Sequence, residues 1–396
     1  MYHSSSKTLN SRLVLGCGLL AFALTLTACG GGGGGGGTIP STGTSAGAST
    51  GSGAPPAASS SYSSNIAGAA AWLNTQQLHD GAILYTSSKI EPYYANLAAT
   101  GLTKVPGQLP HVRQWMAWFV NHINTTDVWG LGGTIYDYGY SGGVETPLNS
   151  ADSVDSYDAT FLTLARVLYD TGDPTSQQYV ASLKPTLENL AATIAAIQQS
   201  DGLTIALPGT KFAYLMDNAE VYRGLSDLSY LETNAFGNGT KASTYTQDAQ
   251  LVATGISSLW NASNSTFAYA KSEPNGVLNQ SSWSNWYPDA TAQLYPIVEG
   301  VISPSSAQAL SLWNGFNSAY PQWSTLNNPS GYPWAVVADT AVLMNDTGAV
   351  TTYISNTQTQ YAAKNFPWTW YCAEGGWYIR TMNQMQIGTS ALLADN

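Results

Sequence analysis

The sequence predicts an all-α domain, and three observations lead to this prediction. Apolar residues recur at helical spacing, as in Val112, Trp115, Met116, Phe119 and Val120. This spacing places one apolar stripe along each helix. The segments with strand-like alternation are short, and no repeat of fixed period is visible, which argues against a solenoid. Amphipathic helices joined by short turns and loop hairpins are therefore expected.

Proline, glycine and capping residues set the expected helix boundaries. Pro110 lies in a first turn, and the segment 171–174, Thr-Gly-Asp-Pro, ends one helix and starts another. The predicted helices are residues 66–78, 110–123, 157–168, 174–199 with a break near Pro185, 217–233, 241–260, 289–298, 304–317, 334–343, 349–359 and 380–393. Extended segments are expected at residues 134–140, 203–207, 211–215 and 266–270, as loop hairpins and not as a central sheet.

The first 28 residues read as a signal peptide. Lys7 and Arg12 precede an apolar run over residues 13–26 that is too short to span a bilayer. The segment 26–29, Leu-Thr-Ala-Cys, resembles the lipobox of bacterial lipoproteins, with an ordinary secretory signal as the alternative. The resemblance implies cleavage before Cys29, lipidation of Cys29 and anchoring in the cell envelope, expected at the periplasmic or surface face of the outer membrane.

A flexible tether is expected over residues 29–64. It is a glycine run followed by Ser, Thr, Ala and Pro, which cannot bury enough apolar surface to fold. Residues 65–396 contain no further low-complexity segment and are expected to form one domain. Of the three cysteines, only Cys372 remains for the domain, as a buried small hydrophobe or, alternatively, a nucleophile. No Cys/His metal spacing is present, and no cofactor is implied.

The composition indicates the class of partner. A net charge of −11 makes nucleic acid and anionic membrane surfaces poor partners, so membrane contact is expected through the lipid alone. Charged residues are only 9% of the chain, whereas Trp numbers 13 and Tyr 24. Aromatic faces together with amides and hydroxyls are typical of neutral sugar sites. A monomer with a carbohydrate partner is therefore expected.

The helix count, the carboxylates at helix starts and the aromatic loops resemble the six-hairpin glycosidase superfamily. The resemblance covers the whole region after the tether. It implies an (α/α)6 toroid of about six helical hairpins, in which loops and inner-helix starts converge on one open end. It also implies glycoside hydrolysis, mostly with inversion, by one protonated and one ionised carboxyl group.

Six acidic residues are the candidate catalytic groups on this basis. Asp80 is the expected general acid, because it begins an aromatic loop after the first helix and the superfamily often keeps an acid there. Asp155 or Asp217 is the expected base. The full candidate set is Asp80, Asp137, Asp155, Asp158, Asp217 and Glu220. Each has a structural alternative: an Asp-Gly turn at Asp80, and helix capping for the pairs 155/158 and 217/220.

Candidate substrate-binding residues lie in aromatic, loop-like segments. Those expected to stack on sugar rings are Tyr136, Tyr138, Trp286, Tyr287, Trp370 and Trp377, and those expected to supply polar contacts are Asn96, Tyr222, Arg223 and Asp289.

Two other function classes are open from the sequence. A polysaccharide lyase on the same toroid needs a Tyr or His base and positive charge, which could come from clustered Arg113, Arg166, Arg223 and Arg380. A non-catalytic glycan-binding lipoprotein would keep the aromatic residues without a carboxylate pair across a cleft.

Overall fold

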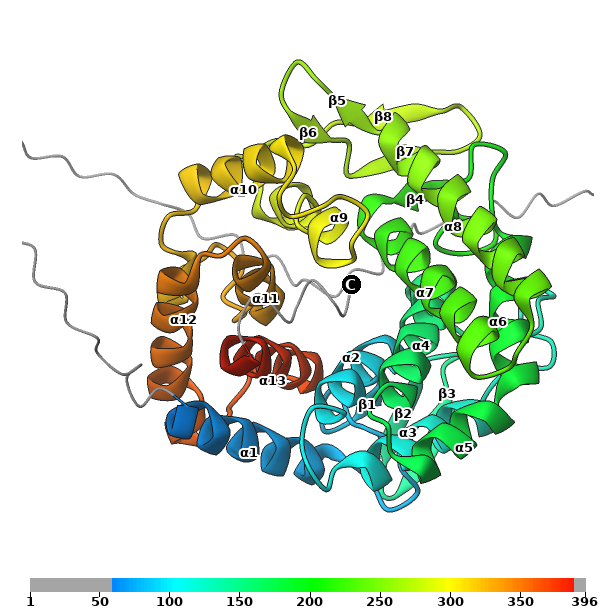
Figure 1. Cartoon of the computed structure of the whole chain (residues 1–396), viewed down its shortest axis with the longest axis horizontal. Coiled ribbons are helices and arrows are strands. Elements are labelled where there is room, and N and C mark those ends of the chain that lie inside the picture. Colours follow the sequence, from blue (N-terminus) through cyan, green and yellow to red (C-terminus); the bar gives the residue numbers. More distant parts are fainter. Residues whose placement is uncertain (1–58, 388–396) are drawn as a thin grey trace, which may run out of the picture. The chain divides into compact units, whose positions relative to one another are not determined.

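Six inner helices form a ring in the computed structural model, which describes residues 59–387 (Figure 1). Each inner helix packs on the next, and the last packs on the first, which closes the ring. In ring order these helices are α2 (Pro92–Leu102), α4 (Val154–Tyr169), α7 (Leu215–Asn234), α9 (Tyr295–Val298), α11 (Ala335–Leu343) and α13 (Cys372–Ile387).

Outer helices alternate with the inner ones along the chain. They are α1 (Ser59–Gln76), α3 (Leu109–Asn121), α5 (Pro174–Ser182), α6 (Lys184–Ala196), α8 (Gly239–Ser258), α10 (Ala307–Ala319) and α12 (Thr347–Gln360). Because every inner helix is entered from an outer one, the inner helices run in the same direction and their starts gather at one end of the ring. The predicted all-α (α/α)6 toroid is confirmed.

Short antiparallel strands join the loops at that end. One sheet has the order β1 (Lys89–Ile90), β2 (Tyr138–Ser141), β3 (Val144–Pro147), and a second has the order β4 (Phe212–Tyr214), β7 (Ala270–Ser272), β8 (Val277–Asn279). A third pairs β5 (Trp260–Asn261) with β6 (Thr266–Phe267). Ile90 pairs with Tyr138, so the first sheet ties the loop before α2 to the loop before α4. These are loop hairpins, as expected, and not a central sheet.

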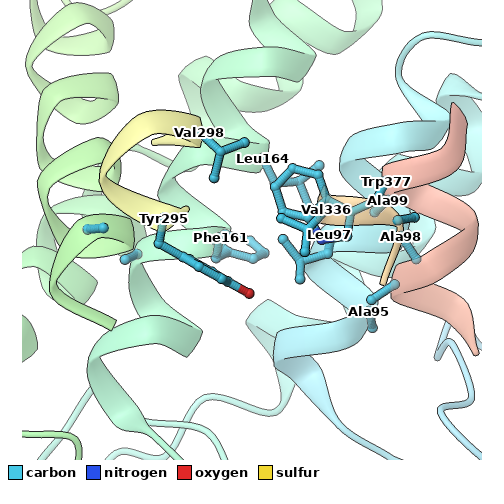
Figure 2. Packing of buried hydrophobic residues seen from close by; sticks show 14 of the residues in the cluster. Ala95, Leu97, Ala98, Ala99, Phe161, Leu164, Tyr295, Val298, Val336 and Trp377 are labelled. Carbon is cyan, nitrogen blue, oxygen red and sulfur yellow. The ribbon is translucent and has the colours of Figure 1, made fainter. Parts of the chain in front are cut away.

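The core consists of side chains from successive inner helices. Figure 2 shows Leu97 of α2, Phe161 of α4, Val298 of α9 and Val336 of α11 in one cluster with Trp377 of α13. A side chain at Gly101 would collide with the backbone of Gly376, so these two glycines permit the close packing of α2 on α13.

Several predicted boundaries are corrected. Helix α2 was not predicted, because most of its residues are buried and it therefore lacks the polar stripe that periodicity detects. Helix α13 begins at Cys372 and not at residue 380, because Gly375 and Gly376 resemble a loop in sequence but serve helix packing. The predicted helix 289–298 is only a π-helical turn, Trp286–Ala290, followed by α9.

The tether boundary and the break near Pro185 can also be compared with the structure. Helix α1 begins at Ser59, so it takes in the last six residues that we assigned to the tether. The expected break near Pro185 is confirmed, since α5 ends at Ser182 and α6 begins at Lys184. The signal peptide, Cys29 and most of the tether lie outside the described residues. Within residues 59–387, no helix is both long and apolar enough to cross a bilayer.

Cys372 is a buried free cysteine at the start of α13, as predicted for a small hydrophobic residue. Burial raises the pKa of its thiol far above the usual range, so the thiol stays protonated at neutral pH. A protonated, inaccessible thiol is a poor nucleophile. The alternative role of Cys372 as a nucleophile is therefore not supported.

Candidate active site

Three carboxylates converge where the first two inner helices begin. Glu91 directly precedes α2, Asp152 lies just before α4, and Asp137 lies in the loop that leads into β2. Lys89 on β1 forms an ion pair with Glu91 and a second one, of 3.1 Å, with Oδ2 of Asp137. The β1–β2 pairing brings these loops together. With Asp217, described below, Glu91, Asp137 and Asp152 are called the acidic cluster.

Glu91 occupies the position that normally caps a helix, yet its side chain makes no capping hydrogen bond to α2. The carboxylate meets Lys89 instead. Desolvation by burial raises the pKa of Glu91 to about 7, repulsion from Asp137 and Asp152 adds to the rise, and Lys89 opposes it. Glu91 is therefore a carboxyl group that carries a proton over much of the mildly acidic range.

Asp152 is an accessible carboxylate just before the start of α4. Its residue is exposed, and its carboxylate forms no hydrogen bond or ion pair within residues 59–387. Surrounding protein nevertheless desolvates it, and this together with repulsion from Asp137 raises the pKa of Asp152 to about 6. Solvent therefore reaches a carboxylate that also lies close to other acidic groups of the protein. Asp152 can therefore hold a water molecule or contact a ligand.

Asp217 approaches the acidic cluster from α7. The Ser153 hydroxyl lies 2.5 Å from Oδ1 of Asp155 and 3.0 Å from Oδ2 of Asp217, so one side chain bridges the two carboxyl groups. Burial, followed by repulsion from Asp155 and Asp152, raises the pKa of Asp217 well above its usual value. Asp217 is only half-buried, so it can also be reached from the site.

The other predicted acids on α4 and α7 are inside the protein. Asp155 is fully buried and accepts hydrogen bonds from the Thr204 hydroxyl at 2.6 Å and the Ser156 amide at 3.0 Å. Asp158 is fully buried, and neither carboxyl oxygen has a hydrogen-bond partner in the described part of the chain. Burial raises the pKa of Asp158 well above its usual value, so it is held in the neutral form. Neither side chain is placed to contact a substrate.

Glu220 lies one helical turn below Asp217, toward the ring interior. Its Oε1 accepts a 2.6 Å hydrogen bond from the Tyr93 hydroxyl, and its residue is 3% exposed. Burial and then repulsion from Glu299 raise the pKa of Glu220 well above its usual value. Glu220 therefore links α7 to α2 beneath the acidic cluster.

An aromatic cluster adjoins Glu91. Tyr85 and Tyr94 stack with ring centroids 4.7 Å apart, and Tyr371 contacts both rings at 5.3 and 5.0 Å. Trp368 packs edge-on against Tyr85 and is 55% exposed. Glu91 contributes to the raised pKa values of Tyr85 and Tyr94, which places its carboxylate beside these rings. The aromatic cluster is defined as Tyr85, Tyr94, Tyr332, Trp368 and Tyr371.

Sequence reasoning did not select these residues or Glu91, Asp152 and Lys89. A usable signal was present in the segment Glu91-Pro92-Tyr93-Tyr94, where a carboxylate and two aromatic residues precede a stretch without periodicity. The exposed Trp368 is four residues before the start of α13, again at an inner-helix start.

Asp80 lies on an exposed turn. Its Oδ1 accepts a 3.2 Å hydrogen bond from the Ala82 amide, and Gly81 has a φ of 106°, which only glycine adopts easily. Its other neighbour is Glu145 on β3, whose pKa it helps to raise. The structure thus fits the turn interpretation of Asp80, and none of its interactions within residues 59–387 reaches the acidic cluster.

Most of the predicted stacking residues are in the core. Trp370 and Trp377 are 2% and 4% exposed, and Trp370 packs against Phe366 and Trp72. Buried rings cannot stack on a sugar without rearrangement. The same holds for Tyr136, Tyr138 and Trp286. Tyr287 is the exception, since it is half-buried, packs on Trp334 with centroids 5.6 Å apart and lies close enough to Tyr94 to affect its pKa.

The predicted polar contacts have structural partners. Asn96 is fully buried, and its side-chain amide forms hydrogen bonds with Tyr157, Thr160 and Trp115. These bonds join α2 to α4 and α3. Asp289 accepts a 2.8 Å hydrogen bond from the Ser282 amide. Arg223 forms a 2.7 Å ion pair with Asp227 on its own helix, and Tyr222 faces a groove on the outside of the ring. None of these four belongs to the acidic cluster.

The described residues contain no group of three or more His, Cys, Asp or Glu arranged to hold a metal ion. Within the acidic cluster, the basic side chain is Lys89. The arrangement therefore offers four carboxyl groups with raised pKa values and an aromatic wall. Lys89 pairs with Glu91 and Asp137, and Asp152 is exposed.

No family model matches the sequence, and no curated protein matches it. Solved structures with a similar fold include a GH63 mannosylglycerate hydrolase from Thermus thermophilus, with 10% sequence identity, a TM-score of 0.58, and coverage of 80% of this chain and 99% of that chain. A rhamnosidase from Klebsiella oxytoca gives 12% identity, a TM-score of 0.56, and coverage of 85% and 66%. A wild-type glycosidase has 10% sequence identity and a TM-score of 0.60, and the match covers 85% of this chain and 100% of that chain. At these identities the likeness shows the shared helical-toroid fold alone.

Proposed function

We propose that the protein is a glycoside hydrolase that cleaves a neutral oligo- or polysaccharide at the acidic cluster. The observation that carries the proposal is the exposed, unpartnered Asp152 carboxylate beside Glu91 at the inner-helix starts. The toroid shared with solved glycoside hydrolases supports the same class.

Glu91 is the general acid in this proposal. A pKa of about 7 keeps its proton available for the departing glycosidic oxygen, and its place beside the aromatic cluster brings a stacked sugar ring to it. Lys89 and Asp137 hold Glu91 in position through the shared ion pairs.

Asp152 is the base, which takes a proton from the attacking water. Its exposed carboxylate can contact that water. Inversion is the proposed outcome, and it requires the two carboxyl groups to lie roughly 6.5 to 9.5 Å apart. Asp217 lies near it, and repulsion from Asp155 and Asp152 contributes to the raised pKa of Asp217.

The lyase alternative is less well supported by the same geometry. Each arginine that could have formed a basic cleft is paired elsewhere: Arg113 with Asp173, Arg166 with Asp170 and Asp227, Arg223 with Asp227, and Arg380 with Asp339. The acidic cluster would repel a uronate. A neutral sugar is the substrate class that tolerates this charge.

Lipidation of Cys29 and anchoring in the bacterial envelope complete the proposal. The protein would act as a monomer on its carbohydrate substrate and touch the membrane through the lipid only. This part depends on the sequence of residues 1–29.

The chemistry of the products tests the proposed function. The purified protein is incubated with neutral and uronate-containing polysaccharides, and both reducing ends and absorbance from new double bonds are followed. We expect reducing ends from a neutral substrate, without new unsaturation. Unsaturated products would instead indicate a lyase, and binding without any product would indicate a glycan-binding protein.

A further inference from the structure

A second concave surface lies on the outside of the ring, between α8 and α10. It is a groove of about 840 Å³, within the size range of small-ligand sites. The β5–β6 hairpin lies between these two helices (Figure 1). Its lining includes Tyr222, Gln250, Trp260, Ile302, Gln308 and Ser311, and none of its lining residues is acidic or basic.

The groove lies where the ring contains the short helix α9. The helix has 4 residues, whereas α7 beside it has 20. The chain turns at Gly300 and returns through Val301 and Ile302, so these two residues and Tyr222 of α7 form part of the lining. The outer helices α8 and α10 then stand apart as its two walls.

The groove and the acidic cluster are on different sides of α7. Glu220 and Tyr222 are two positions apart, which is about 200° around a helix. Glu220 faces the ring interior, where Tyr93 donates to it, while Tyr222 faces the groove. The groove is therefore a separate site.

The groove offers several neutral hydrogen-bonding groups. Within residues 59–387, neither the Gln250 and Gln308 side-chain amides nor the Tyr222 hydroxyl forms a hydrogen bond with another residue. Trp260 is half-buried and is anchored by an edge-on contact with Phe267, with ring centroids 4.9 Å apart. Amides and hydroxyls next to an anchored indole match the polar edge and the apolar face of a sugar ring.

We infer that this groove binds a short stretch of neutral oligosaccharide as a non-catalytic site. The absence of charge from its lining disfavours an anionic ligand. The inference does not depend on catalysis at the acidic cluster, since it concerns binding on the other side of α7. A site of this kind would hold a carbohydrate chain against the protein independently of its cleavage.

Calorimetric titration of the purified full-length protein tests the inference. Maltohexaose, cellohexaose, xylohexaose and mannohexaose serve as neutral probes, with hexagalacturonate as the acidic one. The test variant is Gln250→Ala with Gln308→Ala. We expect the double substitution to weaken groove binding of at least one neutral probe about tenfold, because two hydrogen-bonding groups are lost.

Gln247→Ala is the matched control, because Gln247 is an exposed amide on the same helix and is not part of the lining. It should leave binding unchanged. Asp152→Asn should also retain oligosaccharide binding at the groove, which separates this inference from the proposed catalysis. The inference fails if no neutral probe binds, if the double variant and Gln247→Ala bind equally, or if only hexagalacturonate responds to the double substitution. Unchanged thermal unfolding of the double variant shows that the fold is intact.

Discussion

Asp152→Asn is expected to lower kcat/KM on a neutral polysaccharide by about 10²- to 10⁴-fold, the usual contribution of a general base. The amide of Asn cannot accept the proton of the attacking water. Because Asp152 is exposed and its carboxylate forms no hydrogen bond or ion pair within residues 59–387, the substitution should not disturb the fold. Steady-state rates measured from reducing ends, together with the thermal unfolding temperature, check both expectations.

The pH profile separates a catalytic role from a structural one. The wild-type profile of kcat/KM should be bell-shaped. Ionisation of Asp152, with a pKa of about 6, sets the acidic limb, and ionisation of Glu91, with a pKa of about 7, sets the alkaline limb. Asp152→Asn should remove the acidic limb and Glu91→Gln the alkaline one, with similar losses of rate.

Asp80→Asn provides the contrasting variant, because the sequence alone suggested Asp80 as the acid. We expect a change of less than about threefold in kcat/KM, since its bonds are those of a turn. A loss at Asp80 equal to that at Glu91, or unchanged rates in Asp152→Asn, would contradict the proposed assignment.

The free energy of unfolding is expected to fall as the pH rises from about 4.5 to about 7. Glu299 and Glu374 are 7% and 3% exposed, and burial raises the pKa of each from 4.5 to about 7. In this pH range the unfolded chain loses protons that the folded protein keeps. The free energy of unfolding is therefore highest below the pKa of the unfolded state, and it declines as the pH rises to the pKa of the folded state. Each group contributes a loss of roughly 3 kcal/mol.

Urea unfolding at intervals across this pH range measures the effect. Glu299→Gln removes one titrating group, so the slope should become shallower by about 1.4 kcal/mol per pH unit. Glu299 suits this test better than Glu374, because Glu374 also accepts hydrogen bonds from the Trp334 and Ala335 amides, which Gln would disturb. Stability that stays level or increases between pH 4.5 and 7 would disagree with the buried carboxyl groups described above.

Helical periodicity predicted the toroid because most of its helices have one face in water. It failed at α2 and at the start of α13, where burial on most sides and the Gly101–Gly376 approach remove the polar stripe. The closure of the ring depends on contacts between helices far apart in the chain, such as α13 on α2, which no local pattern encodes.

The spacing of the acidic residues did not indicate which of them are buried. Asp155 and Asp158 share one face of α4, and that face is turned into the protein. Asp152 precedes the helix, so its side chain does not lie on that buried helix face, and it reaches solvent. Asp137 and Asp217 were selected and do lie in the acidic cluster, whereas the functional potential of Glu91 depends on Lys89 and Tyr94, which only the folded chain places beside it.

A crystal structure of Glu91→Gln with a neutral oligosaccharide that the wild-type protein cleaves tests the central claim most directly. The substitution removes the proton donor while keeping the shape of the site. The account predicts a glycosidic oxygen beside residue 91, a water molecule on Asp152 and a sugar ring against the aromatic cluster. A chain bound only away from Glu91 and Asp152 would contradict it.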